Sequence, residues 1–336
     1  MKKHVDDHPQ GIIRSRTKGN IGARKLRQIL SSIPHYWFEL SRCRSPSDLY
    51  DWLYYKLPQF FSLRPLPTVL NIELTNNCNF ECPHCPRNAL NEGRGLGFMP
   101  IALFDKIVDE IAGGVSMVKL IGLGEPSLHP QLDHIMRRLR DRRIKTLLYT
   151  NGTLFERYSP SEIMAWRADE LVVSIDGTDE RSFKRLRVGG DFKKLQVNLA
   201  EFRAQRATAV GPTPRIEVRH VIMPNETPAM LKAFTDYWRK GFADTVKYCF
   251  LGTPYDRPRA AARQRPPCRD IRREMHVRYD GRVPLCGYEG HGEWIGALAK
   301  SEVGAVWRAP RLEEVRRLHR KRDLSELEFC KTCQFW

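Results

Sequence analysis

The sequence predicts an α/β protein built on a parallel sheet, followed by a smaller C-terminal module. Six short apolar runs between residues 68 and 250 alternate with segments whose apolar residues follow helical spacing. This alternation is typical of consecutive βα units, which form a parallel sheet with right-handed crossovers, either open or curled into a partial barrel. After Gly252 the alternation stops, and residues 254–267, rich in Arg, Pro and Ala, indicate a linker.

The six apolar runs are the predicted strands. In chain order they are Thr68–Leu74, Met117–Ile121, Ile144–Thr150, Leu171–Ile175, Ile216–Met223 and Thr245–Phe250. The predicted helices between them cover Leu103–Ile111, Leu132–Leu139, Phe192–Gln205 and a segment from Pro228 with the apolar face Met230, Leu231, Phe234 and Trp238. Thr227 before Pro228 is a typical helix start, because Thr caps the helix and Pro suits its first position. In such folds the chemistry lies at the carboxyl ends of the strands.

The C-terminal module is predicted from a turn signal. Met275–Tyr279 and Arg282–Leu285 flank the dipeptide Asp280-Gly281, which predicts a β-hairpin. A helix over Leu312–Arg320 follows, and the last cysteines come after it.

Composition excludes two classes of protein. Of the 336 residues, 41% are hydrophobic, which is enough for a sizeable core and excludes wholesale disorder. No apolar run approaches the roughly 18 to 20 residues of a membrane span, which excludes an integral membrane protein. The net charge of +17 admits an anionic substrate, a nucleic acid or a membrane surface without choosing among them. Because residues 1–30 lack an apolar signal region, we expect a cytoplasmic protein.

Residues 1–66 form a basic, aromatic-rich N-terminal extension. Aromatic residues gather between residues 36 and 61, with a spacing that predicts two short helices. Their rings either pack against the next domain or dock the extension on a membrane surface or a partner.

A tight cysteine cluster directly follows the first predicted strand. Cys78, Cys82 and Cys85 have the spacing C-x3-C-x2-C, in a chain whose nine cysteines favour metal or redox work over disulfides. Three thiolates can ligate three corners of an iron–sulfur cube and leave one iron open for a non-protein ligand. A zinc site that lacks one ligand is the alternative, and the position at a strand end argues against chance.

The cysteine spacing resembles the cluster motif of the radical S-adenosylmethionine (radical SAM) superfamily. The resemblance implies a partial (β/α)6 TIM-like barrel over residues 67–252 and a 4Fe–4S cluster held by these three cysteines. In that family the open iron binds S-adenosylmethionine, and the reduced cluster splits it to a 5′-deoxyadenosyl radical that abstracts hydrogen from a substrate. His84 fits the family's tendency to place an aromatic residue or His before the third cysteine.

Further motifs at successive strand ends support the resemblance. The segment Leu120–Pro126 resembles the family's glycine-rich motif, in which glycines allow close backbone approach and a Glu meets the methionine amino group. The residues that the resemblance places around S-adenosylmethionine are Gly122, Gly124, Glu125, Asn151, Ser174, Asp176 and Arg187. Asp176 could take the ribose hydroxyls and Arg187 a carboxylate. Ordinary turn chemistry is the alternative for Asn151, Ser174 and Asp176.

Four cysteines mark the C-terminal module, residues 253–336: Cys268, Cys286, Cys330 and Cys333. By itself such a set predicts zinc. Beside a radical SAM core, it resembles the auxiliary-cluster domains of the SPASM and twitch subgroup, which implies a small α+β domain with a second 4Fe–4S cluster. A full SPASM domain has about seven cysteines, so four match the shorter twitch version. Four thiolates leave no open iron, which favours electron transfer, as in the dehydrogenase subgroup of butirosin biosynthesis.

Two cysteines remain. Cys43 lies in the aromatic N-terminal region, where we expect an inert packed thiol. Cys249 lies near the end of the sixth predicted strand. It is either a buried structural thiol or, as in some radical SAM epimerases, a donor of hydrogen to a substrate radical.

The leading hypothesis is a radical SAM oxidoreductase that acts on a polar small molecule of aminocyclitol, sugar or nucleotide-sugar type, with or without a phosphate. Its auxiliary cluster would accept an electron, and a flavodoxin- or ferredoxin-type protein would supply electrons. The alternatives are a maturase that modifies a peptide or protein, and an epimerase that uses Cys249. A cluster- or zinc-bearing nucleic-acid-binding protein is the non-enzyme alternative, motivated by the basic runs Arg257–Arg273 and Arg308–Arg322.

Overall fold

The computed structural model describes residues 65–91, 94–250, 268–287 and 293–333, all within the unit Ser62–Trp336. The predicted N-terminal helices, their aromatic residues, Cys43 and the linker 254–267 lie outside the described residues. Among the residues that are described, every helix is too short or too polar to span a bilayer.

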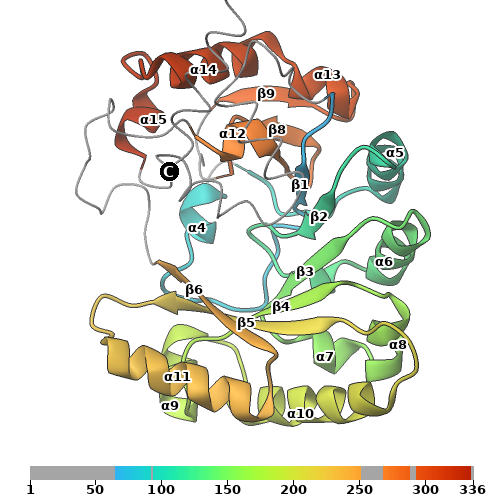
Figure 1. Ribbon diagram of the computed structural model, residues 1–336, viewed down its shortest axis with the longest axis vertical. Coiled ribbons are helices and arrows are strands. Elements are labelled where there is room, and N and C mark those ends of the chain that lie inside the picture. Colours follow the sequence, from blue (N-terminus) through green and yellow to red (C-terminus); the bar gives the residue numbers. More distant parts are fainter. Residues whose placement is uncertain (1–64, 92–93, 251–267, 288–292, 334–336) are drawn as a thin grey trace, which may run out of the picture. The chain divides into compact units, whose positions relative to one another are not determined.

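A seven-stranded parallel sheet forms the centre of the fold (Figure 1). The six predicted strands are confirmed as β1 (Val69–Ile72), β2 (Met117–Leu120), β3 (Thr146–Thr150), β4 (Glu170–Ser174), β5 (Arg215–Ile222) and β6 (Thr245–Phe250). The order across the sheet is β6-β5-β4-β3-β2-β1-β7. Since β6 and β7 are its two edges, the sheet is open, as a partial barrel requires.

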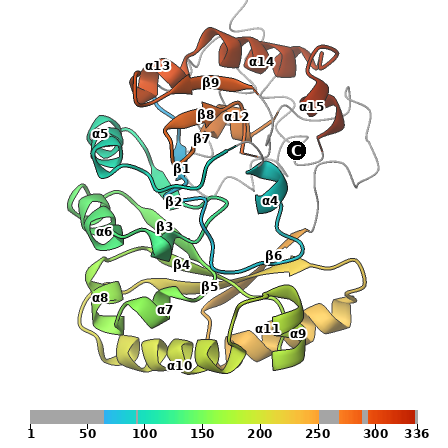
Figure 2. The same cartoon turned by 180° about the vertical axis from the view of Figure 1, so that it is seen from behind.

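Four long helices cover the outer face of this sheet (Figures 1 and 2). They are α5 (Ile101–Ile111), α6 (Leu132–Asp141), α10 (Phe192–Thr208) and α11 (Pro228–Gly241), all at predicted positions. The apolar side of α5 buries Phe104, Ile107 and Ile111 completely, and these side chains belong to the same core as Leu70 and Leu120 of the strands. Burial of such a face supplies most of a helix's stability.

The start of α11 follows the prediction, but one residue of its apolar face does not. The Thr227 side chain accepts a hydrogen bond from the Met230 backbone and caps the helix. Phe234 and Trp238 are buried, whereas the Met230 side chain is 48% exposed. Met230 lies in the first turn of α11, one turn before Phe234, and its exposure shows that its assignment to the apolar face was wrong.

Shorter helices fill the connections. They are α4 (Arg87–Leu90), the 3-10 helix η1 (Pro126–Leu128), α7 (Leu154–Arg157), α8 (Pro160–Ala165) and α9 (Glu180–Leu186). Capping boxes start two of them, Ser159 with Glu162 in α8 and Asp179 with Ser182 in α9.

The C-terminal module contributes a strand to the main sheet. Its elements are α12 (Asp270–Arg273), β7 (Glu274–Val277), β8 (Arg282–Pro284), β9 (Trp294–Ala297), α13 (Val303–Trp307), α14 (Pro310–Lys321) and α15 (Glu328–Thr332). Strand β7 pairs in parallel with β1, from Val69 opposite Glu274 to Ile72 opposite Val277 (Figure 2). The predicted helix 312–320 is confirmed as part of α14.

The predicted hairpin of β7 and β8 is therefore wrong in its pairing, although its turn is real. Gly281 has a φ of +82°, and the Arg278 backbone donates to the Arg282 carbonyl at 2.9 Å. Beyond this turn the two strands form ladders with other partners: β7 pairs in parallel with β1, and β8 pairs antiparallel with β9. Turn residues specify the turn but not which edge the flanking strands find.

A buried arginine joins the helices of this module. Arg316 of α14 is fully buried and donates to the carbonyls of Ile271 at 2.8 Å and Trp307 at 2.7 Å. Its guanidinium also lies 3.9 Å from the centre of the Trp307 ring. These bonds tie α12, α13 and α14 together around one charged group.

Candidate active site

A cavity of about 320 Å³ lies at the carboxyl ends of β1 to β5. Its walls include the three cysteines of the loop after β1 and Arg187. They also include residues that follow β2, β3 and β4, namely Gly122, Gly124, Glu125, Asn151 and Ser174. The structure thus brings together nearly every residue that the motifs selected, at the edge of the sheet where the fold predicts the chemistry.

The three thiols of this loop, which we call the cluster loop (Thr75–Leu90), are free. A turn closed by the Cys85 backbone and the Cys82 carbonyl, at 3.0 Å, holds two of them together. The Asn151 amide lies 3.9 Å from the Cys78 sulfur, and the Arg187 guanidinium lies 3.9 Å from the Cys82 sulfur. Burial raises the pKa of Cys78 and of Cys82. Three thiols in one loop, two of them with an N–H donor near the sulfur, fit an iron–sulfur cluster, whose thiolates accept such bonds.

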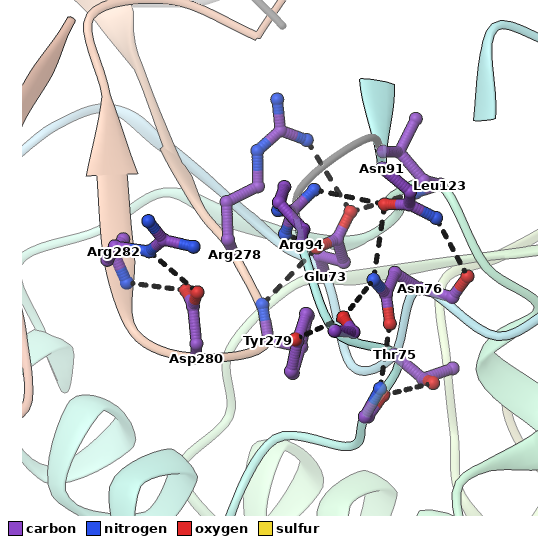
Figure 3. A network of polar contacts seen from close by, with 12 residues as sticks. Glu73, Thr75, Asn76, Asn91, Arg94, Leu123, Arg278, Tyr279, Asp280 and Arg282 are labelled. Carbon is purple, nitrogen blue, oxygen red and sulfur yellow. Dashed lines mark hydrogen bonds and ion pairs between the residues drawn. The ribbon is translucent and has the colours of Figure 1, made fainter. Parts of the chain in front are cut away.

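Asn76 fixes the shape of the cluster loop, a role that sequence analysis missed. The side chain is fully buried (Figure 3) and donates to the Asn91 side chain at 3.1 Å and the Gly95 carbonyl at 2.9 Å. It also accepts from the Gly97 backbone at 2.9 Å. Thr75 adds a bond to the Gly97 carbonyl at 2.6 Å. The polar run Thr75-Asn76-Asn77 directly after an apolar strand was the available signal.

The two glycines after β2 are required for packing. A Cβ on Gly124 would lie 2.3 Å from the carbonyl oxygens of Thr75 and Asn77, and a Cβ on Gly122 would lie 2.4 Å from the Glu73 side chain. The close backbone approach that the glycines allow is therefore made to the cluster loop. Both glycines also line the cavity. Their predicted contact with a bound ligand stays a prediction.

We expect Gly124→Ala to disturb the cluster loop. Its methyl group would overlap two backbone oxygens, so the loop after β2 and the cluster loop must separate. Iron content after anaerobic reconstitution should fall together with binding of S-adenosylmethionine. Gly241→Ala is the matched control, because its Cβ meets open space and a helical Ala is more stable than Gly by about 0.5–1 kcal/mol. Wild-type iron content and affinity in Gly124→Ala would contradict this packing role.

Glu125 belongs to the cavity wall, although it is only 2% exposed. Its Oε1 accepts from the Ser127 backbone at 3.0 Å and the Thr150 hydroxyl at 2.9 Å, and its Oε2 accepts from the Asn151 backbone at 2.6 Å. Burial raises the pKa of Glu125, although these bonds oppose the shift. The carboxylate thus joins the loop after β2 to the end of β3. Its contact with the methionine amino group stays a prediction.

Asp176 lies beneath the cavity and is fully buried. Its Oδ1 meets His220 Nδ1 and the Val221 backbone, each at 2.8 Å, and its Oδ2 meets Arg187 Nε at 2.7 Å and His84 Nε2 at 3.3 Å. Although burial opposes ionisation, hydrogen bonds from His220 and His84 and the charge of Arg187 hold the pKa of Asp176 well below its usual range.

This placement gives Asp176 a role that the sequence did not indicate. Its partners His84 and Arg187 line the cavity, whereas Asp176 itself does not. Asp176 is therefore placed to position these two side chains, and its contact with ribose hydroxyls stays a prediction. Ser174 at the end of β4 is half-buried and belongs to the cavity wall, where it can touch a ligand directly.

Cys249 is on β6, directly opposite Val221 of the cavity wall, but does not itself line the cavity. Its thiol lies 3.5 Å from the His220 carbonyl oxygen, and burial raises its pKa. A protonated thiol with a backbone acceptor favours a packed structural role. The hydrogen-donor role stays a prediction.

The inner face of the sheet carries charges that sequence analysis missed. Tyr149 of the cavity wall accepts a hydrogen bond from Arg219 at 2.8 Å. Glu217, fully buried, pairs with Arg219 and Lys247. The alternation Arg215-Ile-Glu217-Val-Arg219 was the available signal. A strand that packs against apolar side chains on both faces is hydrophobic at nearly every position, so alternating charged residues indicate a polar face.

The four C-terminal cysteines are half-buried. Cys268 precedes α12, Cys286 follows β8, and Cys330 and Cys333 belong to the last helix and its end. Burial raises the pKa of Cys268 to about 12, and the charges of Asp270 and Cys333 add to the shift. Buried thiols in this setting become thiolates when a metal centre binds them, which fits a thiolate-ligated cluster or ion.

Two family models match the chain. Residues 72–237 match the radical SAM superfamily, and residues 268–334 match SPASM, described as an iron–sulfur cluster-binding domain. The second match favours iron over the zinc alternative for the C-terminal cysteines.

Curated relatives match about half of the chain or less. A probable GTP 3′,8-cyclase of Methanococcus maripaludis strain C5 is 32% identical over 171 residues, which cover 50% of this chain and 54% of that protein. An AdoMet-dependent heme synthase of Methanosarcina barkeri is 28% identical over 138 residues, covering 41% of this chain and 39% of that protein. The chain thus spans about half the length of the curated relatives it matches.

Solved structures share the fold over most of the chain. SuiB of Streptococcus suis, bound to its precursor peptide SuiA, has a TM-score of 0.61 at 14% identity and covers 88% of this chain and 80% of that chain. BtrN in complex with AdoMet and 2-DOIA has a TM-score of 0.52 at 15% identity, covering 80% of this chain and 93% of that chain. At these identities the likeness concerns the fold alone.

Proposed function

Because the chain belongs to the radical SAM superfamily and carries a SPASM iron–sulfur domain, we propose that it removes hydrogen from a polar small molecule and oxidises it. The two domains imply a 4Fe–4S cluster with S-adenosylmethionine and an auxiliary cluster, which supply a 5′-deoxyadenosyl radical and an electron acceptor. The observation that carries the proposal is the cavity itself, where three thiols of one loop face residues from four further strand ends.

The residues around this cavity would act as cluster ligands and as hydrogen-bond donors to those ligands. Cys78, Cys82 and Cys85 would hold the first cluster, with the Asn151 amide and the Arg187 guanidinium donating to two of the sulfurs. Such donors stabilise the more negative, reduced state of a cluster. Cys268, Cys286, Cys330 and Cys333 would hold the second cluster.

The inner face of the sheet would receive the substrate. The side chains of Tyr149, Arg219 and Lys247 offer hydrogen bonds and charge beside the cavity. This face suits a hydroxylated or charged molecule better than an apolar one, because a buried charge that loses its solvent needs a polar partner. Loss of one hydrogen atom, then one electron and one proton, would make a carbonyl from a secondary alcohol.

Two other substrate classes come from the comparisons. The names of the curated relatives favour a nucleotide, and the peptide in the SuiB structure favours a peptide. A flavodoxin- or ferredoxin-type protein is the electron donor we expect for any of the three.

The proposal predicts that loss of the second cluster abolishes product formation without abolishing cleavage of S-adenosylmethionine at the first. Cys268→Ser should keep the first cluster and form 5′-deoxyadenosine, yet lose the oxidised product, because the electron acceptor is gone. We would incubate the reconstituted enzyme with S-adenosylmethionine, dithionite and panels of aminocyclitols, nucleotide sugars, GTP and peptides, and identify products by mass spectrometry. A product lighter by two hydrogens is expected from the wild type.

Cys249→Ala is the companion variant. A dehydrogenase should keep its product in this variant, whereas an epimerase that uses this thiol should keep 5′-deoxyadenosine formation and lose its product.

Product formation at the wild-type rate in Cys268→Ser would rule out the auxiliary cluster as the acceptor.

A further inference from the structure

A buried carboxylate, Glu73, lies where three parts of the chain meet (Figure 3). Its side chain directly follows β1 and is 2% exposed. Oε1 meets Arg94 Nη2 at 3.0 Å and the Tyr279 backbone N–H at 3.4 Å. Oε2 meets the Leu123 backbone N–H at 3.0 Å and Arg278 Nη1 at 3.5 Å. One carboxylate therefore contacts the segment after the cluster loop, the glycine-rich loop and the C-terminal module.

The first of these contacts leads to the cluster loop. Arg94 also donates to the Asn91 side chain at 3.3 Å, and Asn91 accepts from Asn76 at 3.1 Å. Asn76 is two residues before Cys78. A short series of side-chain hydrogen bonds thus connects Glu73 to the backbone that presents the first thiol.

The second contact leads to the cavity wall. Leu123 and Gly122 both line the cavity, and Gly122 packs so closely on Glu73 that a Cβ there would lie 2.4 Å from the Glu73 side chain. Any displacement of Glu73 must therefore move the glycine-rich loop. That loop is where the family resemblance places the methionine end of S-adenosylmethionine.

The third contact leads to the C-terminal cysteines. Arg278 follows β7, is 6% exposed and closes the Asp280-Gly281 turn through its backbone. Gly287, the residue after Cys286, packs so closely on His276 of β7 that a Cβ there would lie 2.3 Å from the His276 ring, which brings Cys286 to the end of β7 that Arg278 follows. Burial lowers the pKa of Arg278, and the charges of Glu73 and of Cys286 oppose that shift. The buried Nε of Arg278 has no hydrogen-bond partner within the described ranges. Arg278 is thus a cation between Glu73 and a ligand of the second site.

We propose that the Glu73–Arg278 ion pair is a positioning element shared by both cluster sites. Glu73 fixes the cluster loop and the glycine-rich loop, and Arg278 holds a positive charge beside the auxiliary cluster through Cys286. Positive charge near an iron–sulfur cluster favours its reduced state, because reduction makes the cluster more negative. Removal of Glu73 leaves Arg278 buried without this carboxylate, whereas removal of Arg278 leaves Glu73 paired with Arg94.

The test uses the reconstituted full chain and needs no substrate. Arg278→Met should lower the midpoint potential of the auxiliary cluster in an EPR-monitored redox titration, while Arg278→Lys, which keeps the charge, should stay nearer the wild type. Glu73→Gln should weaken binding of S-adenosylmethionine about tenfold, the effect of losing one charged hydrogen bond. Asp244→Asn is the control, since Asp244 pairs with Arg206 at 2.8 Å and accepts from the Ile216 backbone at the opposite end of the sheet.

Each outcome decides the proposal. A lower potential in Arg278→Met, with wild-type potentials in Asp244→Asn, supports it. Unchanged potential in Arg278→Met and unchanged affinity in Glu73→Gln, at wild-type iron content, overturn it. If Arg278→Met fails to fold, a wild-type affinity for S-adenosylmethionine in Glu73→Gln, at wild-type iron content, overturns it as well. Because no substrate enters, a failure of the oxidoreductase proposal would leave these results as they are.

Discussion

Cys85→Ala is expected to abolish 5′-deoxyadenosine formation and to halve the iron content from about eight to about four per chain. Two thiolates cannot hold the cube that three hold, so the S-adenosylmethionine site loses its iron. The side chain of Cys85 is exposed and belongs to a surface turn, so the fold should tolerate the substitution. Iron and sulfide analysis with chromatographic detection of 5′-deoxyadenosine measures both effects.

Cys249→Ala is the matched control for this experiment. It removes a half-buried thiol that lies outside the cavity wall and should leave about eight irons and full cleavage activity. A Cys85→Ala protein that still cleaves S-adenosylmethionine would refute the assignment of the cluster loop.

Asp176→Asn is expected to lower the free energy of unfolding by about 3–5 kcal/mol. The substitution removes the charge that balances Arg187 and His220, and an amide cannot accept at both positions from four donors. Arg187 would then be buried without this carboxylate, and His220 would keep Glu226 as its acidic partner. Urea unfolding under anaerobic conditions, followed by circular dichroism, measures the change.

Asp236→Asn provides the comparison. The same chemical change here breaks a pair with Lys232 in which both side chains are more than half exposed, and such pairs contribute about 0–1 kcal/mol. If both variants unfolded at the same urea concentration, Asp176 could not be the centre of a buried charge network.

The sequence was sufficient for the features that depend on local patterns. Apolar periodicity located the six strands and four long helices, and the spacing of Cys78, Cys82 and Cys85 located the site. The strand ends then came together because parallel strands bring their carboxyl ends to one edge. The roles of Glu73 and Asp176 depend instead on partners up to about two hundred residues away, which local patterns do not specify.

The pairing of β7 shows the same limit. Asp280-Gly281 predicted a turn correctly, yet the strand before it joined β1, whose free edge no local signal reveals.

Reaction chemistry is likewise underdetermined by the fold. The names of the similar structures and relatives concern a peptide, a nucleotide and heme, so the shared sheet does not by itself specify a substrate.

The union of β1 with β7 also affects how the protein is made. Val69 and its partner Glu274 are 274 − 69 = 205 residues apart, which the ribosome needs roughly 10 to 40 s to synthesise. Throughout that interval β1 has an uncovered edge, the kind of edge on which nascent chains aggregate. A chaperone that shields this strand, or translation fast enough to bring β7 out early, should therefore raise the yield of intact protein more than any change within the catalytic cavity.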